Sequence, residues 1–107
     1  MNIQKSKPES TPENRLDLLR IQLDNCDSEL MRVLEKRMRL SREIGELKKR
    51  QGIGVYQKQR YEKLIIQRSA EAVSCGLDRD FVRQLFEIVH NESVRQQTEI
   101  AKNSLTE

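Results

Sequence analysis

Four basic side chains fall on or beside the apolar stripes of the predicted helices. Arg37 interrupts an apolar stripe whose members recur at steps of three and four: Leu16, Leu19, Leu23, Cys26, Leu30, Val33, Leu40, Ile44 and Leu47. Arg20, Lys48 and Arg60 also fall next to apolar stripe positions. Burying a guanidinium or ammonium group is costly unless an anion and hydrogen-bond acceptors accompany it. Each of these cations therefore needs an anionic partner, which is either an acidic side chain of the helices or a bound ligand.

One such arginine has an ordinary explanation. It can reach solvent from the edge of the stripe, or it can set the register of a coiled coil. The whole set is harder to explain in this way, because Ser93 and Gln97 also place polar groups on the inner face of the last predicted helix. Asp27 is the one acid near these faces, and one carboxylate cannot neutralise four cations. A small dicarboxylate ligand would fit this excess of positive charge.

A long first helix is predicted from residue 12 to about residue 50. Thr11 offers an N-cap and Pro12 suits the first helical position, whereas residues 1–11 are polar and are expected to form a disordered lead-in. The pattern stops at Gly52-Ile53-Gly54. Gly45 lies inside this helix, where glycine costs about 1 kcal/mol relative to alanine, so we expect another helix or a ligand to approach it closely.

Two further helices are predicted. The second runs from about residue 57 to residue 73 and is followed by Gly76, which can take a left-handed cap. The third begins after Asp78, a plausible N-cap. Their stripes contain Tyr61, Leu64, Ile65, Arg68 and Ala72 in the second helix, and Val82, Leu85, Phe86, Val89, Ser93, Gln97 and Ile100 in the third.

The composition is typical of an all-α protein, because charged residues make up 35% of the 107 residues and aromatic residues only 4%. The three predicted helices together form one domain, which spans residues 12–103. The first helix is longer than so small a domain can cover, so part of its stripe has no partner within the chain. A second copy would cover it most simply, which predicts a homodimer. A plain coiled coil is the alternative, but the stripes of the other two helices favour a compact bundle.

Several classes of function are disfavoured. Basic and acidic residues alternate despite a net charge of +3, and few aromatic residues are present to stack bases, so no nucleic-acid partner is expected. The sequence has no apolar run of transmembrane length, and no membrane partner is expected. Cys26 and Cys75 lack metal-ligand spacing and suggest reduced thiols in a cytoplasmic protein. His90 has no second histidine or cysteine at ligand spacing, so we expect a surface or boundary residue, no metal and no cofactor.

Five short stretches together resemble the AroQ class of chorismate mutases, the all-helical type II enzymes. They are Arg20 in LLRIQLD, Arg37 in LEKRMRL, Lys48 in IGELKKR, Arg60 in YQKQRYE and the closing ESVRQQ. Each stretch alone is weak, but their order and spacing follow the family over about residues 15–100. The resemblance implies three helices per chain in an intertwined homodimer, with two equivalent sites that each take residues from both chains.

The resemblance also implies roles for these residues. Arg37 and Arg60 of one chain and Arg20 of the other would bind the two carboxylates of chorismate. Lys48 and Gln97 would donate hydrogen bonds to its ether oxygen, and Ser93 would lie near the ring-side carboxylate or hydroxyl. The family converts chorismate to prephenate, in phenylalanine and tyrosine biosynthesis, by a rearrangement that needs no nucleophile, metal or proton transfer. A site that restricts the conformer and stabilises developing charge is sufficient.

Two positions depart from the commonest family pattern. Gln57 replaces an aspartate at the start of the second helix, and Tyr61 replaces the glutamate that commonly meets the substrate hydroxyl. Glu62 cannot take over, because one residue along a helix turns the side chain by about 100°. Gln57 and Tyr61 could bond the same region through an amide and a hydroxyl.

These departures leave two alternatives to the mutase. Isochorismate-pyruvate lyases share the fold and a similar cationic set, and they also lack the glutamate. The other alternative is a non-catalytic helical dimer, although a scaffold has no reason to keep unpaired cations. Feedback regulation and association with another enzyme of the pathway are not visible in the sequence.

Overall fold

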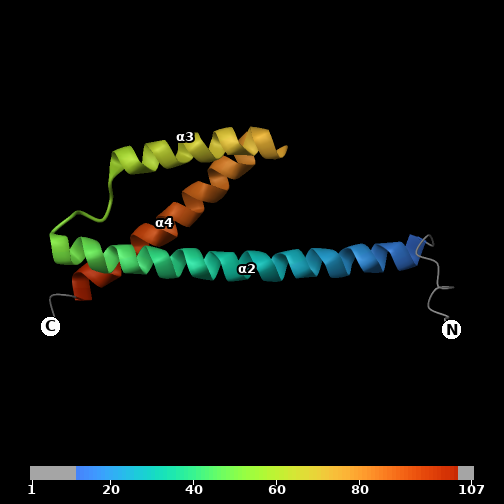
Figure 1. Cartoon of the computed structure of the whole chain (residues 1–107), viewed down its shortest axis with the longest axis horizontal. Coiled ribbons are helices and arrows are strands. Elements are labelled where there is room, and N and C mark those ends of the chain that lie inside the picture. Colours follow the sequence, from blue (N-terminus) through green and yellow to red (C-terminus); the bar gives the residue numbers. More distant parts are fainter. Residues whose placement is uncertain (1–11, 104–107) are drawn as a thin grey trace. The chain divides into compact units, whose positions relative to one another are not determined.

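The computed structural model describes residues 12–103, which form three helices and no strand (Figure 1). They are α2 (Pro12–Gln51), α3 (Lys58–Cys75) and α4 (Arg79–Asn103). The all-α prediction is confirmed, and the helix boundaries fall within about two residues of those predicted. The expected lead-in at 1–11 and the proposed N-cap Thr11 lie outside the described residues. No helix in the described range is long and apolar enough to cross a membrane.

Helix boundaries follow the local signals in the sequence. The end of α3 is closed by Gly76 in the left-handed conformation, with φ 75°, and Leu77 N–H donates to Ala72 O at 2.9 Å. The start of α4 is capped by Asp78, whose Oδ2 accepts from Phe81 N–H at 2.8 Å. Gln57 is the N-cap residue of α3 but makes no side-chain capping bond. Both predicted capping residues, Gly76 and Asp78, are therefore confirmed.

The described chain divides into two compact units, residues up to Arg37 and residues from Met38 onward. In the first unit α2 is one uninterrupted helix, and every apolar stripe residue from Leu16 to Val33 is exposed. Leu23 and Val33, for example, are 61% and 62% exposed. The first unit therefore has an apolar face that its own residues do not cover.

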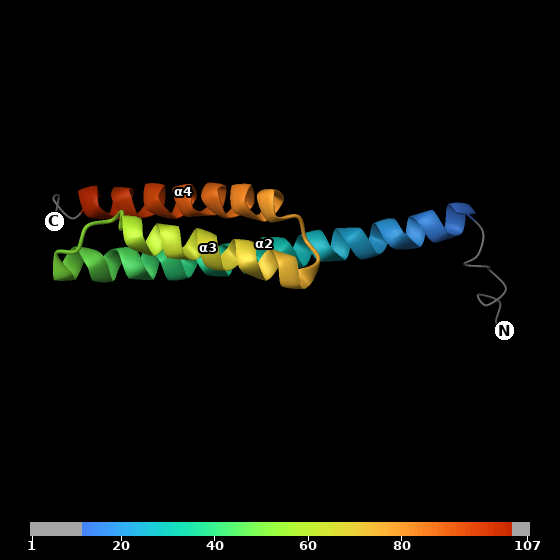
Figure 2. The same ribbon diagram turned by 90° about the horizontal axis from the view of Figure 1, so that it is seen from above.

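In the second unit α3 packs against α4, and the end of α2 meets α4 through side-chain hydrogen bonds. α3 runs back against the direction of α2, and α4 reverses again so that its C-terminal half lies beside the end of α2 (Figures 1 and 2). The apolar core is small and consists of Leu64 and Ala72 on α3 with Val82 and Val89 on α4. Leu85 also belongs to the predicted stripe of α4, but its side chain is exposed, at 37%, rather than part of this core.

Polar residues complete the core of this second unit. Ser41, Ser93 and Gln97 are all less than 10% exposed. Buried polar groups must be hydrogen-bonded to avoid a large desolvation cost, so their partners define how α2 and α4 meet.

Candidate functional site

The end of α2 and the C-terminal half of α4 meet through the side chain of Gln97. Gln97 Nε2 donates to the backbone oxygen and to Oγ of Ser41, both at 2.9 Å. Gln97 Oε1 accepts from Lys48 Nζ at 3.0 Å. Two residues predicted to belong to one site, Lys48 and Gln97, are therefore in direct contact although 49 positions separate them.

Lys48 is half-buried and is held by neutral oxygen atoms. Its second hydrogen bond goes to the backbone oxygen of Val55, at 2.8 Å, in the segment that joins α2 to α3. Burial, and then repulsion by the Arg60 guanidinium, lower the pKa of Lys48 below its usual value. The charge of Arg60, a second predicted cation, therefore contributes to the lowered pKa of Lys48. An anion bound beside Lys48 would stabilise its charged form.

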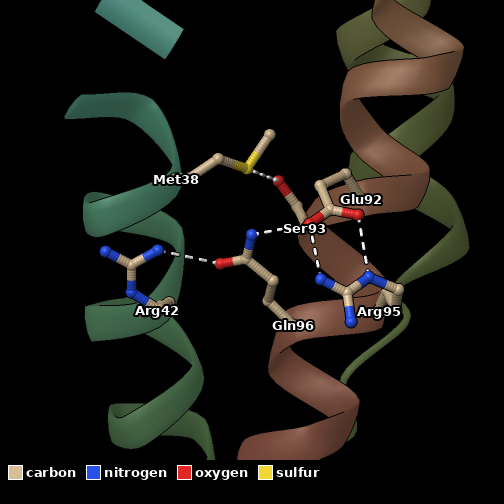
Figure 3. Close-up of polar contacts among 6 residues, drawn as sticks. All are labelled: Met38, Arg42, Glu92, Ser93, Arg95 and Gln96. Atoms are coloured by element: carbon tan, nitrogen blue, oxygen red, sulfur yellow. Dashed lines mark hydrogen bonds and ion pairs between the residues drawn. The ribbon is translucent and has the colours of Figure 1, made fainter. Parts of the chain in front are cut away.

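Ser93 lies one helical turn before Gln97 on α4. Its hydroxyl contacts the sulfur of Met38 at 3.7 Å, again between α2 and α4 (Figure 3). Ser93 is buried, as its place on the inner face of the predicted helix required. It therefore lies at the same helix junction as Gln97.

A surface network joins the same two helices beside Ser93. Arg42 Nη1 donates to Gln96 Oε1 at 3.0 Å, and Gln96 Nε2 donates to Glu92 Oε2 at 2.7 Å (Figure 3). Arg95 binds both oxygens of Glu92, at 2.8 and 2.7 Å. Hydrogen bonds from Arg95, and then from Gln96, lower the pKa of Glu92 to about 2. Glu92 and Arg95 thus neutralise each other's charge. We therefore interpret the network as part of the framework that surrounds Lys48 and Gln97.

Tyr61 and Gln57 take positions that the sequence did not predict in detail. Tyr61 is half-buried, and its hydroxyl donates to Glu87 Oε2 on α4 at 3.3 Å. Its ring lies 4.4 Å from the ring of His90, between centroids, and Tyr56 lies near both rings. Burial, and then the Glu87 carboxylate, raise the pKa of Tyr61, so this phenol stays protonated. Gln57 is exposed at the start of α3.

His90 is half-buried, which fits its prediction as a boundary residue. The two remaining predicted site residues, Arg20 and Arg37, lie on α2 in the first unit, where Arg20 is exposed and Arg37 is half-buried.

Several residues at the site were missed by sequence reasoning. The backbone oxygen of Val55 and the Glu87 carboxylate gave no signal by type or spacing, whereas Ser41 lies seven residues before Lys48, a spacing that places both on one side of α2. Gly45 did give one: a Cβ built on it would lie 2.8 Å from Gln97 Cγ, so the close approach expected at this glycine is made by α4.

The geometry thus provides a half-buried ammonium group, a carboxamide bonded to it and a second cation nearby. In comparison with known proteins, the family model of chorismate mutase type II matches residues 19–98. The chain belongs to this family. The match includes Arg20, Arg37, Lys48, Arg60, Ser93 and Gln97.

Two relatives illustrate the range of the chorismate mutase type II family. The T-protein of Enterobacter agglomerans is 35% identical over 78 residues, which are 73% of this chain and 21% of that protein. The 4-amino-4-deoxychorismate mutase of Streptomyces venezuelae is 29% identical over 97 residues, which are 90% of this chain and 94% of that protein. The chain thus spans about a fifth of the T-protein but nearly the whole of the Streptomyces enzyme.

Proposed function

We propose that this chain is a chorismate mutase, which rearranges chorismate to prephenate. The observation that carries the proposal is the Lys48–Gln97 pair, a half-buried ammonium bonded to a carboxamide, in a chain of the chorismate mutase type II family. In this reaction the ether C–O bond breaks as a C–C bond forms, and negative charge develops on the ether oxygen. Lys48 would donate to that oxygen, with no nucleophile or proton transfer required.

The carboxylates of chorismate need further cations. Arg60 is exposed, and its charge already acts on Lys48, so it would bind one carboxylate at the edge of the site. We assign the remaining contacts to Arg37 of the same chain and Arg20 of a second copy. Ser93 would meet the ring-side carboxylate or hydroxyl. No metal or cofactor enters this chemistry.

The second copy is proposed because the apolar stripe of α2 is exposed. Leu16, Leu23 and Val33 in the first unit are between 47% and 62% exposed in the single chain. An exposed row of apolar side chains favours an interaction surface, and the same stripe on a second chain would be a self-complementary partner. The resulting homodimer would be intertwined and contain two equivalent sites.

The rate is expected to be flat from mildly acidic to neutral pH and to fall at alkaline pH. Gln97 does not titrate, so no carboxyl at this position can impose an acid-only profile. Lys48 must stay charged, and burial and Arg60 lower its pKa, so kcat/KM should fall with a midpoint below the ordinary lysine value of 10.5. A kcat/KM profile from pH 5 to 10.5 measures this, and a rate confined to acidic pH would contradict it.

A second candidate substrate is 4-amino-4-deoxychorismate. It is favoured by the match over 94% of the Streptomyces enzyme and by the Tyr61–Glu87 contact, which brings a carboxylate toward the position where the family commonly has a glutamate. An ammonium substituent would interact with that carboxylate more strongly than a hydroxyl would. The isochorismate-pyruvate lyase stays an alternative because of Gln57 and Tyr61.

Parallel turnover assays distinguish these candidates. The purified chain is given chorismate, 4-amino-4-deoxychorismate or isochorismate, and the products are identified. We expect the highest kcat/KM for chorismate, with prephenate as product. A faster reaction of the amino compound would reassign the substrate, salicylate and pyruvate as the main products would indicate the lyase, and no turnover of any substrate would favour the non-catalytic helical dimer.

The cytoplasm is the proposed compartment. Cys26 and Cys75 are both exposed free thiols in the structure, and exposed unpaired cysteines suit a reducing environment.

A further inference from the structure

The carboxamide of Gln97 is held from two sides by α2. On one side its nitrogen donates to the backbone oxygen and to Oγ of Ser41, both at 2.9 Å. On the other side its oxygen accepts from Lys48 Nζ at 3.0 Å. Ser41 and Gln97 are each only 6% exposed, so bulk water does not compete for the two bonds between them. The buried amide is therefore bonded through all of its polar atoms.

Only one orientation of this amide satisfies both sides. In the reversed orientation the NH₂ group of Gln97 would face the ammonium group of Lys48, and both groups are donors. The oxygen of Gln97 would at the same time face the carbonyl oxygen of Ser41, and both atoms are acceptors. Ser41 and Lys48 thus select the same orientation, with the amide oxygen toward Lys48.

Gly45 allows Gln97 to reach this position. A Cβ at residue 45 would lie 2.8 Å from Cγ and 3.3 Å from Cβ of Gln97, distances at which one of the groups must move. Gly45 is also buried and helical, and glycine is disfavoured in a helix relative to alanine. The close approach of α4 is a specific reason for glycine at this position.

We propose that Ser41 and Gly45 are positioning residues for the reaction that we propose above, on which this inference rests: Gly45 admits Gln97 to the end of α2, and Ser41 fixes its carboxamide with the oxygen toward Lys48. Gln97 Oε1 and the Val55 oxygen then take two of the three N–H groups of Lys48 and leave the third for a ligand.

The two acceptors on Ser41 can be separated by substitution. The backbone oxygen is kept in every variant of Ser41, whereas the hydroxyl is lost when valine or alanine takes its place. Substitutions at this position therefore measure what the second hydrogen bond adds to the orientation of the Gln97 carboxamide.

A matched pair of variants tests the role of the hydroxyl. Ser41→Thr adds a methyl group and keeps the hydroxyl, whereas Ser41→Val has the same branched shape with a methyl group in place of the hydroxyl. We expect kcat/KM to stay within about threefold of wild type for Ser41→Thr and to fall by about five- to tenfold for Ser41→Val, the effect of one hydrogen bond. Ser41→Ala, which adds no bulk, is expected to behave like Ser41→Val.

A second pair tests the close approach. Gly45→Ala is expected to lower kcat/KM by about tenfold or more, because it displaces Gln97 from Ser41 and Lys48. Gly54→Ala is the matched control, since a Cβ at residue 54 meets nothing within 4 Å. Equal effects of the two alanine substitutions, or no effect of either, would overturn the role of Gly45.

The side-chain amide signal of Gln97 in a ¹H–¹⁵N spectrum provides a readout that does not depend on turnover. The signal is assigned by its loss in Gln97→Glu. We expect Ser41→Thr to keep the wild-type shifts and slow solvent exchange, and Ser41→Val and Gly45→Ala to change the shifts and speed the exchange. An unchanged signal in Ser41→Val, or equal kcat/KM for the Thr and Val variants, would overturn the positioning role. An inactive wild type would instead overturn the proposed function, and the amide signal would still decide whether Ser41 orients Gln97.

Discussion

Lys48→Ala is expected to lower the turnover of chorismate by at least about 100-fold, while the helices and their assembly are retained. Lys48 is the donor that we assign to the ether oxygen, and it is already oriented by Gln97 and by the Val55 oxygen. A preorganised charge of this kind stabilises the transition state without reorganising during the reaction. The lowered pKa of Lys48 also indicates that its charged form is poorly solvated in the free enzyme, so an anionic ligand improves its environment.

The matched control for this variant is Lys49→Ala, which removes the same charge from the neighbouring position of α2. It is expected to keep turnover within about threefold of wild type, because one residue along a helix points the side chain elsewhere. Circular dichroism and sedimentation establish that both variants remain folded and assembled. Retained turnover in a folded Lys48→Ala variant would remove Lys48 from the mechanism.

Two inactive variants are expected to restore activity when they share a dimer. If Arg20 enters the site from the second copy, a heterodimer of Arg20→Ala and Lys48→Ala contains one site with both residues intact and one site with neither. Random assembly makes half of the dimers heterodimers, so about a quarter of all sites recover. The recovered kcat, measured after the variants are unfolded and refolded together, gives this fraction.

The control for complementation pairs Lys48→Ala with Arg60→Ala. Both residues are proposed to act in a site of the same chain, and the Arg60 guanidinium contributes to the lowered pKa of Lys48. Their heterodimer has no intact site, so no recovery is expected. Recovery in this mixture, or its absence in the Arg20 mixture, would contradict the proposed sharing of the site between chains.

The sequence was sufficient to predict the helices because their signals are local. The apolar steps defined α2, α3 and α4, and Gly76 and Asp78 marked a helix end and a helix start by backbone conformation and capping. The polar residues on apolar faces were informative for a related reason. Burial of Ser93 and Gln97 follows from their register with Val82 and Val89 on α4, which periodicity alone provides.

The contacts within the candidate site could not be predicted in the same way. Ser41 and Gln97 lie 56 positions apart, and their contact depends on how α2 meets α4. The oxygen of Val55 belongs to the backbone, so no residue type signals it. The Tyr61–Glu87 bond pairs two residues that local patterns do not connect. Gly45 did indicate a close approach, because glycine is disfavoured inside a helix, but it did not indicate which residue makes the contact.

The most direct test is the conversion of chorismate by the purified wild-type chain in buffer with and without a metal chelator. If the site holds chorismate in its reactive conformer and Lys48 stabilises the breaking bond, prephenate should form about 10⁶-fold or more faster than in buffer alone, and the chelator should have no effect. Failure to accelerate prephenate formation, or loss of that acceleration on chelation, would contradict a mutase that works through Lys48 and its neighbours alone.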